Sequence, residues 1–266
     1  MRLVFTDLDG TLLDQETYTY TQAYPALREL RRQKVPMILC SSKTRSELEY
    51  WRKRLKNRHP FIAENGGAIF IPKGYFPFSV PHTRASADCE IIELGSPYPE
   101  LLYSLQTASQ ESHCRVLGFH LMDADEISRH SGLPLEQAQL AKKREYDEPF
   151  LILDYGRTPQ LLSAIESQGK RWTRGGRFYH ILGPSDKGRA VRVLAHIYRQ
   201  LGEPVVTFGL GDRFNDAELL NSVDSPIIVW SKVAPILKTI VLKAKITDQA
   251  GPSGWNEAVL EALRSR

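Results

Sequence analysis

Four short apolar runs break off abruptly in polar or glycine-rich residues along this 266-residue chain. They are LVFTD (3–7), VPMILCSS (35–42), PFIAENGG (60–67) and PVVTFGLGD (204–212). A continuous apolar run bounded by turn signals is typical of a strand buried on both faces of a parallel sheet. Helical patterns with one apolar face lie between the runs, at 23–32, 44–55 and 187–201. This alternation predicts an α/β fold with a doubly wound parallel sheet of the Rossmann-like kind.

The middle of the chain has a different pattern. Runs that alternate between apolar and polar residues occur at 89–95, 150–155 and 177–183, with helical stretches near 99–111 and 135–144. Such runs indicate an antiparallel sheet with helices on one face. We therefore expect a core formed by residues 1–81 and 184–266, interrupted by an inserted α+β cap domain at 82–183.

Charge and cysteine content narrow the class of protein. The formal net charge is only +4 and the charges are dispersed; the basic stretch 51–58 fits the exposed face of a helix, so we expect no nucleic-acid partner. A mild positive surplus suits small anionic substrates. Cys40, Cys89 and Cys114 are far apart and form no CxxC pair, which disfavours a disulfide framework or a zinc site and favours a reducing compartment. No charged leader or long apolar run is present, so we expect a cytoplasmic protein without a membrane partner.

Two carboxylates follow the first apolar run. Asp7 and Asp9 are two residues apart, so in an extended segment both side chains point the same way. They could bind a cation, perform acid/base chemistry or cap a turn. Two adjacent carboxylates repel each other unless a cation lies between them, and hard oxygen ligands favour Mg²⁺. An EF-hand loop is disfavoured because Gly10 is fourth rather than sixth and a strand precedes the motif.

A second acidic cluster follows the last apolar run, in GLGDRFND (209–216). Asp212 comes directly after Gly211, and Asp216 lies one helical turn later. Asp212 alone could be a helix N-cap, and so could Ser41 at the end of the second run. Lys187 opens a predicted helix, where the helix dipole disfavours a cation, which suggests an anion nearby.

These scattered residues are predicted to meet at one edge of the sheet. In an open parallel sheet, ligands bind beyond the carboxyl ends of the strands. Asp7, Ser41 and Asp212 all follow such strands, and Lys187 begins the helix that leads into the last of them.

DLDGT (7–11), Ser41, Lys187 and GDRFND (211–216) resemble, in this order, the four motifs of the haloacid-dehalogenase-like phosphatases. The predicted insertion is similar to the large α+β cap of the Cof-like branch of that superfamily. Longer strings resemble the mannosyl-3-phosphoglycerate phosphatases within it: SSKTRSE (41–47), PFIAENGGAIFIPKGYFPF (60–78), KREYDEP (143–149) and GGRFYHILGPSDKGRAV (175–191). Lys43 stands where many relatives in the wider branch have arginine.

The resemblance implies a Mg²⁺-dependent phosphatase that works by two-step phosphoryl transfer. Asp7 would be the nucleophile and form an aspartyl-phosphate, and Asp9 would be the general acid and base. Mg²⁺ would be held by Asp7, the backbone carbonyl of Asp9 and Asp212. Ser41 and Lys187 would hold the phosphate oxygens, and the remaining motif residues, Asn215 and Asp216, would orient this group.

The implied substrate is a small phosphorylated sugar that carries a carboxylate. Arginine can bind a carboxylate with two parallel hydrogen bonds. The residues expected to contact the substrate are Lys43, Arg45, Glu64, Asn65, Arg144, Arg177, His180 and Asn215. Each of the three arginines could equally be a structural ion pair, and His180 could be an ordinary strand residue.

Other functions stay open at this point. The same site could prefer glucosyl-3-phosphoglycerate, sucrose phosphate or other sugar phosphates. A phosphomannomutase shares the core but moves phosphate within one sugar, so release of inorganic phosphate separates the two. A catalytically silent sugar-phosphate sensor would bind its ligand with Mg²⁺ and leave it intact.

Overall fold

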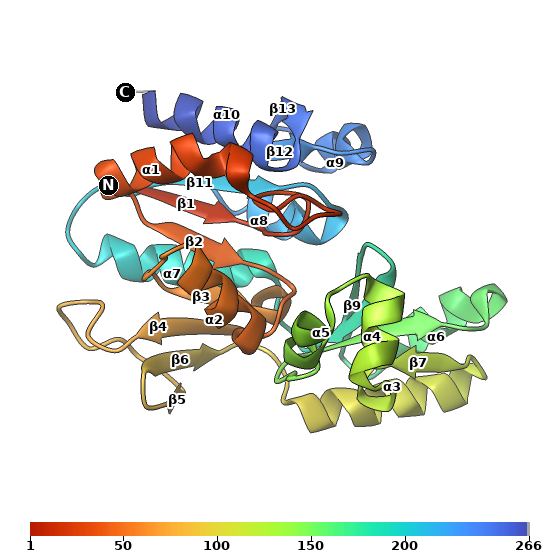
Figure 1. Cartoon of the computed structure of the whole chain (residues 1–266). Helices are drawn as coiled ribbons and strands as arrows, with labels where there is room; N and C mark the ends of the chain where they lie inside the picture. Colours follow the sequence, from red (N-terminus) through yellow and green to blue (C-terminus); the bar gives the residue numbers. More distant parts are fainter. Residues whose placement is uncertain (265–266) are drawn as a thin grey trace.

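The computed structural model describes residues 1–264 and arranges them in two sheets, each flanked by helices (Figure 1). The larger sheet has nine strands in the order β13-β12-β11-β1-β2-β3-β4-β6-β5. Its strands are β1 (Arg2–Thr6), β2 (Met37–Cys40), β3 (Phe61–Ala63), β4 (Ala68–Pro72), β5 (Arg84–Ala85), β6 (Cys89–Glu93), β11 (Val206–Gly211), β12 (Ser225–Trp230) and β13 (Lys245–Ala250). The strands from β13 to β3 are parallel, and β4, β6 and β5 extend the sheet in antiparallel fashion.

Helices cover both faces of the larger sheet. One apolar cluster packs the sheet against α1 (Tyr24–Arg32), α2 (Arg45–Arg54) and α10 (Gly251–Arg264). A second cluster packs the opposite face against α7 (Lys187–Arg199), α8 (Ala217–Leu220) and α9 (Ala234–Ile240). The predicted doubly wound α/β fold is therefore confirmed, because parallel strands with no polar face must be covered on both sides.

The smaller sheet is antiparallel, in the order β7-β8-β10-β9. Its strands are β7 (Val116–Gly118), β8 (Asp147–Ile152), β9 (Arg171–Gly175) and β10 (Phe178–Leu182). α3 (Tyr98–Ser112) and α6 (Thr158–Ser167) pack on one face. α4 (Ala124–Ser131) and α5 (Leu135–Ala141) share a separate cluster with Phe178. We expected helices on one face only, and this was wrong: Phe178 and Ile181 point to opposite faces of β10, and each face has its own helices.

The strand that we expected in the insertion at 89–95 belongs to the larger sheet. β6 pairs with β4, so that Ile91 lies opposite Phe70, and Ile91 is fully buried in the core. An alternating pattern marks an antiparallel strand but does not say which sheet it joins. We propose that the inserted cap begins after β6 and that the chain returns to the core between β10 and α7.

Five short 3-10 helices complete the described chain: η1 (Thr21–Ala23), η2 (Glu64–Gly66), η3 (Phe119–Leu121), η4 (Tyr155–Arg157) and η5 (Phe214–Asp216). In η2 all three residues have positive φ. Gly66 is required there, because a Cβ on it would lie 2.2 Å from the carbonyl oxygen of Asp186. In residues 1–264 no helix is both long and apolar enough to cross a membrane.

Candidate active site

The carboxyl ends of β1, β2 and β11 bring three predicted residues to one edge of the larger sheet. β1 lies between β11 and β2, and Asp7, Ser41 and Asp212 are the residues that directly follow these strands. The backbone N–H of Asp7 still donates to the carbonyl of Leu210 at 2.9 Å, which holds Asp7 beside β11. The convergence expected from the parallel pattern is therefore observed.

Lys187, the first residue of α7, reaches into this edge and is fully buried. Its Nζ lies 2.7 Å from Asp7 Oδ1 and 2.6 Å from Asp216 Oδ1. Burial alone would lower the pKa of Lys187, but Asp216 and Asp7 hold this pKa above its ordinary value. The two carboxylates explain how a lysine is tolerated at a helix N-terminus.

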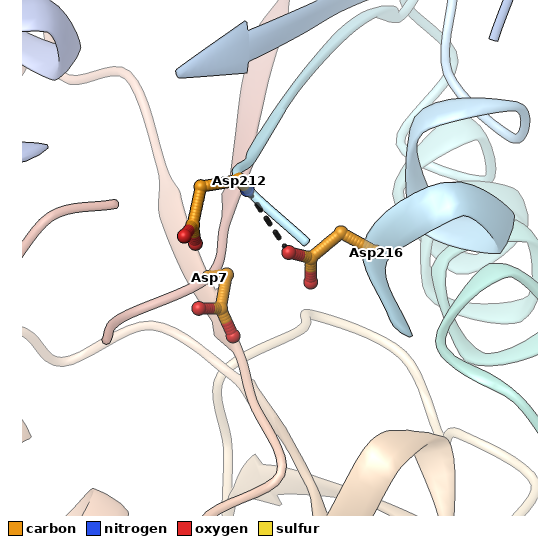
Figure 2. Close-up of side chains that lie close together, drawn as sticks. All are labelled: Asp7, Asp212 and Asp216. Carbon is orange, nitrogen blue, oxygen red and sulfur yellow. Dashed lines mark hydrogen bonds between the residues drawn. The ribbon is translucent and has the colours of Figure 1, made fainter. Parts of the chain in front are cut away.

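Three buried carboxylates meet around one point (Figure 2). Oxygen atoms of Asp7, Asp212 and Asp216 all lie within 4.8 Å of one another. Burial raises the pKa of Asp7 to about 7, with Asp216 and Asp9 adding to the effect and Lys187 opposing it. Burial and the neighbouring Asp216 likewise raise the pKa of Asp212 well above its usual value. Three acids facing one lysine leave an excess of negative charge, which suits a divalent cation with oxygen ligands.

Asp216 is held by its surroundings on both carboxylate oxygens. Oδ1 accepts from Lys187, and Oδ2 accepts from the backbone N–H groups of Asp212 at 3.0 Å and Arg213 at 3.1 Å (Figure 2). Asp212 in turn accepts from the hydroxyl of Thr11 at 2.9 Å. This pattern fits the predicted orienting role of Asp216.

Asp9 pairs with Lys43 rather than with Lys187. Lys43 Nζ lies 2.8 Å from Asp9 Oδ2 and 3.6 Å from Glu47 Oε1. Burial disfavours the charge on Lys43, but Asp9 and Glu47 raise its pKa above the ordinary value. Asp9 Oδ1 is buried and has no hydrogen-bond partner among the described residues, so its capacity to form a hydrogen bond is unused.

A cleft of about 670 Å³ opens from this edge towards the smaller sheet. Of the predicted site residues, it is lined by Asp9, Lys43, Arg144, Arg177 and His180. A smaller adjoining cavity of about 90 Å³ is lined by Asp7, Asp9 and Asn215. The residues expected to carry out phosphoryl transfer and several of the expected substrate contacts therefore line two adjoining cavities.

A chain of hydrogen bonds behind the cleft joins the two parts of the molecule. His180 Nδ1 lies 2.8 Å from Asp147 Oδ1, and Asn65 donates to Asp147 Oδ2 at 2.7 Å. Asn215 donates to Asn65 Oδ1 at 3.3 Å. Asp147 is fully buried; burial would raise its pKa, but His180 and Arg144 keep it below the usual value.

Three expected substrate contacts line neither cavity: Asn65, whose side chain donates to Asp147, and the two residues described next. Arg45 pairs with Glu49 at 2.7 Å and rests over the ring of Phe70. Glu64 is buried, and its carboxylate accepts from the backbone N–H groups of Glu145 and Tyr146 at 3.0 and 2.7 Å. Both therefore serve packing or the contact between the two parts of the chain.

Arg144 and Ser41 are buried at the site. The guanidinium of Arg144 donates to the carbonyls of Ala141 and Ser42 at 2.9 and 2.8 Å and to Asp147 Oδ1 at 3.5 Å, so three of its five N–H groups have a partner. The hydroxyl of Ser41 accepts from the N–H of Lys43 at 3.4 Å.

Sequence reasoning missed several residues of the cleft. Gln15, Tyr18, Ser42, Arg213 and the Gly175–Gly176 turn between β9 and β10 all line it. The glycine pair, with φ of +62° at Gly176, was a turn signal that could have been found. Tyr18 carries no motif; it is recognised only because it packs against an apolar cluster of each part of the molecule.

One hydroxyl at the boundary has two acceptors. Thr44 caps α2, and its Oγ1 lies 3.1 Å from Glu47 Oε2 and 3.0 Å from the carbonyl oxygen of Leu140, which is in α5.

Comparison with known proteins identifies the family of this chain. A family model described as haloacid dehalogenase-like hydrolase matches residues 4–92. Over 263 residues the chain is 42% identical to a glucosyl-3-phosphoglycerate/mannosyl-3-phosphoglycerate phosphatase of Methanococcoides burtonii, covering 98% of this chain and 97% of that protein. This chain belongs to the haloacid dehalogenase-like phosphatases.

Two further likenesses accompany this one. A mannosyl-3-phosphoglycerate phosphatase of Pyrococcus horikoshii is 38% identical over 231 residues, covering 87% of this chain and 91% of that protein. A crystal structure of a Thermoplasma acidophilum protein has the same fold, with a TM-score of 0.70, 18% identity and 99% of each chain covered. The predicted resemblance is confirmed, and this haloacid dehalogenase-like phosphatase is a phosphoric monoester hydrolase acting on a small molecule.

Proposed function

We propose that this phosphatase hydrolyses mannosyl-3-phosphoglycerate to mannosylglycerate and phosphate, and that glucosyl-3-phosphoglycerate is a second substrate of the same site. The observation that carries the proposal is the 42% identity, over nearly the whole of both chains, to a phosphatase named for these two substrates. The cleft supports it, because arginine, lysine and histidine side chains line the space next to the acidic cluster.

In the first step an oxygen of Asp7 attacks phosphorus, and the bond from phosphorus to the glycerate oxygen breaks. The pairing of Asp7 with Lys187 holds the attacking carboxylate in place. Asp9 gives its proton to the leaving oxygen, through the Oδ1 atom that has no partner among residues 1–264.

In the second step Asp9 takes a proton from water, whose oxygen attacks phosphorus. The bond between phosphorus and Asp7 breaks, inorganic phosphate leaves and the Asp7 carboxylate is restored. Lys187 and Ser41, both buried at the strand ends, would bind the phosphate oxygens in both steps.

The residues fit a Mg²⁺ ion. Asp7, Asp212 and the backbone carbonyl of Asp9 would hold it, and Asp216 and Asn215 would orient these groups. When bound, the ion would offset the negative charge of the nucleophile and of the phosphate. The raised pKa values of Asp7 and Asp212 support this, since burial and the neighbouring carboxylate of Asp216 disfavour their charged forms, and a bound cation would favour them.

Recognition of the rest of the substrate is assigned to the inserted cap. Arg177 follows the Gly175–Gly176 turn and lines the cleft, so it is the best-placed arginine for the glycerate carboxylate. His180, oriented by Asp147, would contact hydroxyls or the carboxylate, and Lys43 of the core would assist it from the other side of the cleft.

We also propose a cytoplasmic location. Cys40, Cys89 and Cys114 are free and buried thiols, which suit a reducing compartment.

The deciding experiment is a phosphate-release panel with Mg²⁺ on mannosyl-3-phosphoglycerate, glucosyl-3-phosphoglycerate, sucrose phosphate and simple sugar phosphates. The two glycosyl-phosphoglycerates should have the highest kcat/KM, and a clear preference for another sugar phosphate would refute the substrate. Asp7→Asn should abolish phosphate release, while Asp88→Asn, an exposed aspartate outside the site, should leave it unchanged. Binding of the substrate by the wild type without any phosphate release would instead indicate a sensor.

A further inference from the structure

A second cavity, of about 350 Å³, lies beside the active-site cleft, and Tyr18 lines both. Its walls come from the segment that leads into α1, from α2 and, through Pro134 and Gln137, from the start of α5. The cavity therefore lies at the boundary between the two parts of the molecule. No catalytic residue proposed above lines it.

Aromatic rings form much of the lining. Tyr20 lies 5.4 Å from Tyr24 and 6.3 Å from Trp51, measured between ring centroids, and Tyr50 lies 5.4 Å from Trp51. Tyr24 is half exposed, so it is not simply a member of the apolar core. Aromatic rings that border an open cavity offer flat faces with a partial negative charge.

The same cavity has buried polar atoms without partners. Gln137 is 94% buried, and within residues 1–264 neither its Oε1 nor its Nε2 has a hydrogen-bond partner. The indole N–H of Trp51 is also buried and unpaired in the described chain. An unpaired buried donor or acceptor destabilises the folded protein, so a bound molecule that pairs with these atoms would recover that cost.

We propose that this cavity binds the ring of a neutral glycoside. A pyranose ring presents C–H groups to aromatic faces, which matches the exposed ring of Tyr24 beside Tyr20. Its hydroxyls both donate and accept, which matches the unpaired indole N–H of Trp51 and the amide of Gln137. The volume lies at the small end of the range for small-molecule sites. Among the described lining residues the charged side chain is Arg54, which lies over the rings of Tyr50 and Trp51. No carboxylate is among them, so the cavity has no partner for a cationic ligand.

Such a site would couple the two parts of the chain. Gln137 belongs to the inserted cap and Trp51 to the core, so a ring held by both favours the arrangement in which they lie close together. The site is separate from the proposed phosphatase chemistry and does not depend on which phosphate ester is hydrolysed.

The test uses the indole N–H signals of the four tryptophans in ¹⁵N-labelled wild-type protein, titrated with methyl α-D-mannopyranoside. The Trp51 signal is assigned by its loss in Trp51→Phe. It should shift in a saturable way, while the signals of Trp172 and Trp255, whose indoles donate to Glu166 and Thr6, should stay in place. If the Trp51 signal does not shift up to about 100 mM glycoside, the dissociation constant exceeds that of any useful binding site, and the proposal is overturned.

Two variants separate this cavity from the active-site cleft. Gln137→Leu keeps the volume and removes the amide, so it should weaken the Trp51 titration at least tenfold, leave phosphate release unchanged and not lower the melting temperature. His180→Ala alters the cleft and should leave the titration unchanged. A titration that survives Gln137→Leu, or one that is lost in His180→Ala, would place the glycoside elsewhere and overturn the proposal.

Discussion

Lys43 Nζ lies 2.8 Å from Asp9 Oδ2, and Lys43 is buried between Asp9 and Glu47. The ammonium group therefore fixes the carboxylate that is proposed to carry the proton, and leaves only Asp9 Oδ1 open. This makes Lys43 a positioning residue for Asp9, whether or not it also touches the substrate.

Lys43→Met should lower kcat at least tenfold, because Asp9 loses its anchor and Glu47 keeps a buried charge without its cation. Breaking a buried pair of this kind costs about 3–5 kcal/mol, so the free energy of unfolding should fall as well. Lys43→Arg keeps the charge and should retain more of both properties. A Lys43→Met enzyme with normal kcat and reduced stability would show that Lys43 serves only the fold.

The acidic cluster predicts how stability depends on pH and Mg²⁺. Burial raises the pKa of Asp7 to about 7, so between about pH 4 and pH 7 the folded metal-free protein binds more protons than the unfolded chain. The free energy of unfolding should therefore fall with rising pH across this window, by up to about 4 kcal/mol, and level off above it.

Adding Mg²⁺ at pH 8 should raise the melting temperature of the wild type, because the ion binds only the folded state. In Asp7→Asn the metal-free protein should be less sensitive to pH and should gain less from Mg²⁺. Melting curves with chelator and with Mg²⁺ at pH 5 and pH 8 measure this. An unchanged Mg²⁺ response in Asp7→Asn would contradict the role of Asp7 as a ligand.

Glu64 is expected to stabilise the contact between the two parts of the chain. Its buried carboxylate accepts from the N–H groups of Glu145 and Tyr146, and burial, against the opposing charge of Arg144, raises its pKa to about 8. Glu64→Ala leaves those donors unpaired and should lower the free energy of unfolding by about 2–4 kcal/mol.

Glu64→Gln keeps one acceptor oxygen and should lower the free energy of unfolding by less than Glu64→Ala does. It should also flatten the decrease in stability that the raised pKa predicts between about pH 4.5 and pH 8. Denaturant unfolding at pH 6 and pH 8 is the measurement. Glu145→Gln, whose exposed side chain pairs with Arg84, is the control and should change little. Equal effects of Glu64→Ala and Glu145→Gln would contradict the prediction.

Arg177 and Arg144 are predicted to behave differently although both line the cleft. Arg177→Ala should reduce kcat/KM for mannosyl-3-phosphoglycerate by about tenfold or more, because a charged hydrogen bond to the carboxylate is lost. Hydrolysis of an aryl phosphate, which has no such carboxylate, should be nearly unchanged. Arg144→Ala should reduce both activities together, because the guanidinium ties Ser42 to Ala141 and Asp147. Parallel losses for Arg177→Ala would argue against carboxylate recognition.

The catalytic edge could be predicted from the sequence because parallel strands place their carboxyl ends together. Asp7, Ser41 and Asp212 follow adjacent strands, and Lys187 was recognised by its unfavourable place at a helix start. The partner of a strand could not be predicted in the same way, because the alternating pattern of residues 89–95 does not indicate that β6 pairs with β4.

Residues that act across the boundary were harder to predict. Arg45 carried the right chemistry but points to Glu49 and Phe70, because the direction of a side chain at a helix start depends on how the helix packs. Asp147 orients His180 from within a strand; its segment KREYDEP (143–149) carried part of the family resemblance, but no pattern in it assigned Asp147 this role. Such roles are set by contacts between segments that are distant in sequence.

Thr44 has a single hydroxyl proton but two acceptors, one in its own helix and one in α5. If the cap swings away from the core, the carbonyl of Leu140 leaves, yet the proton still has Glu47 to receive it. The hydroxyl therefore keeps a hydrogen-bond acceptor in either case, and separation at this point costs less free energy than the complete loss of a hydrogen bond. Thr44 therefore opposes separation of the two parts less than a hydroxyl whose single acceptor lay across the boundary would.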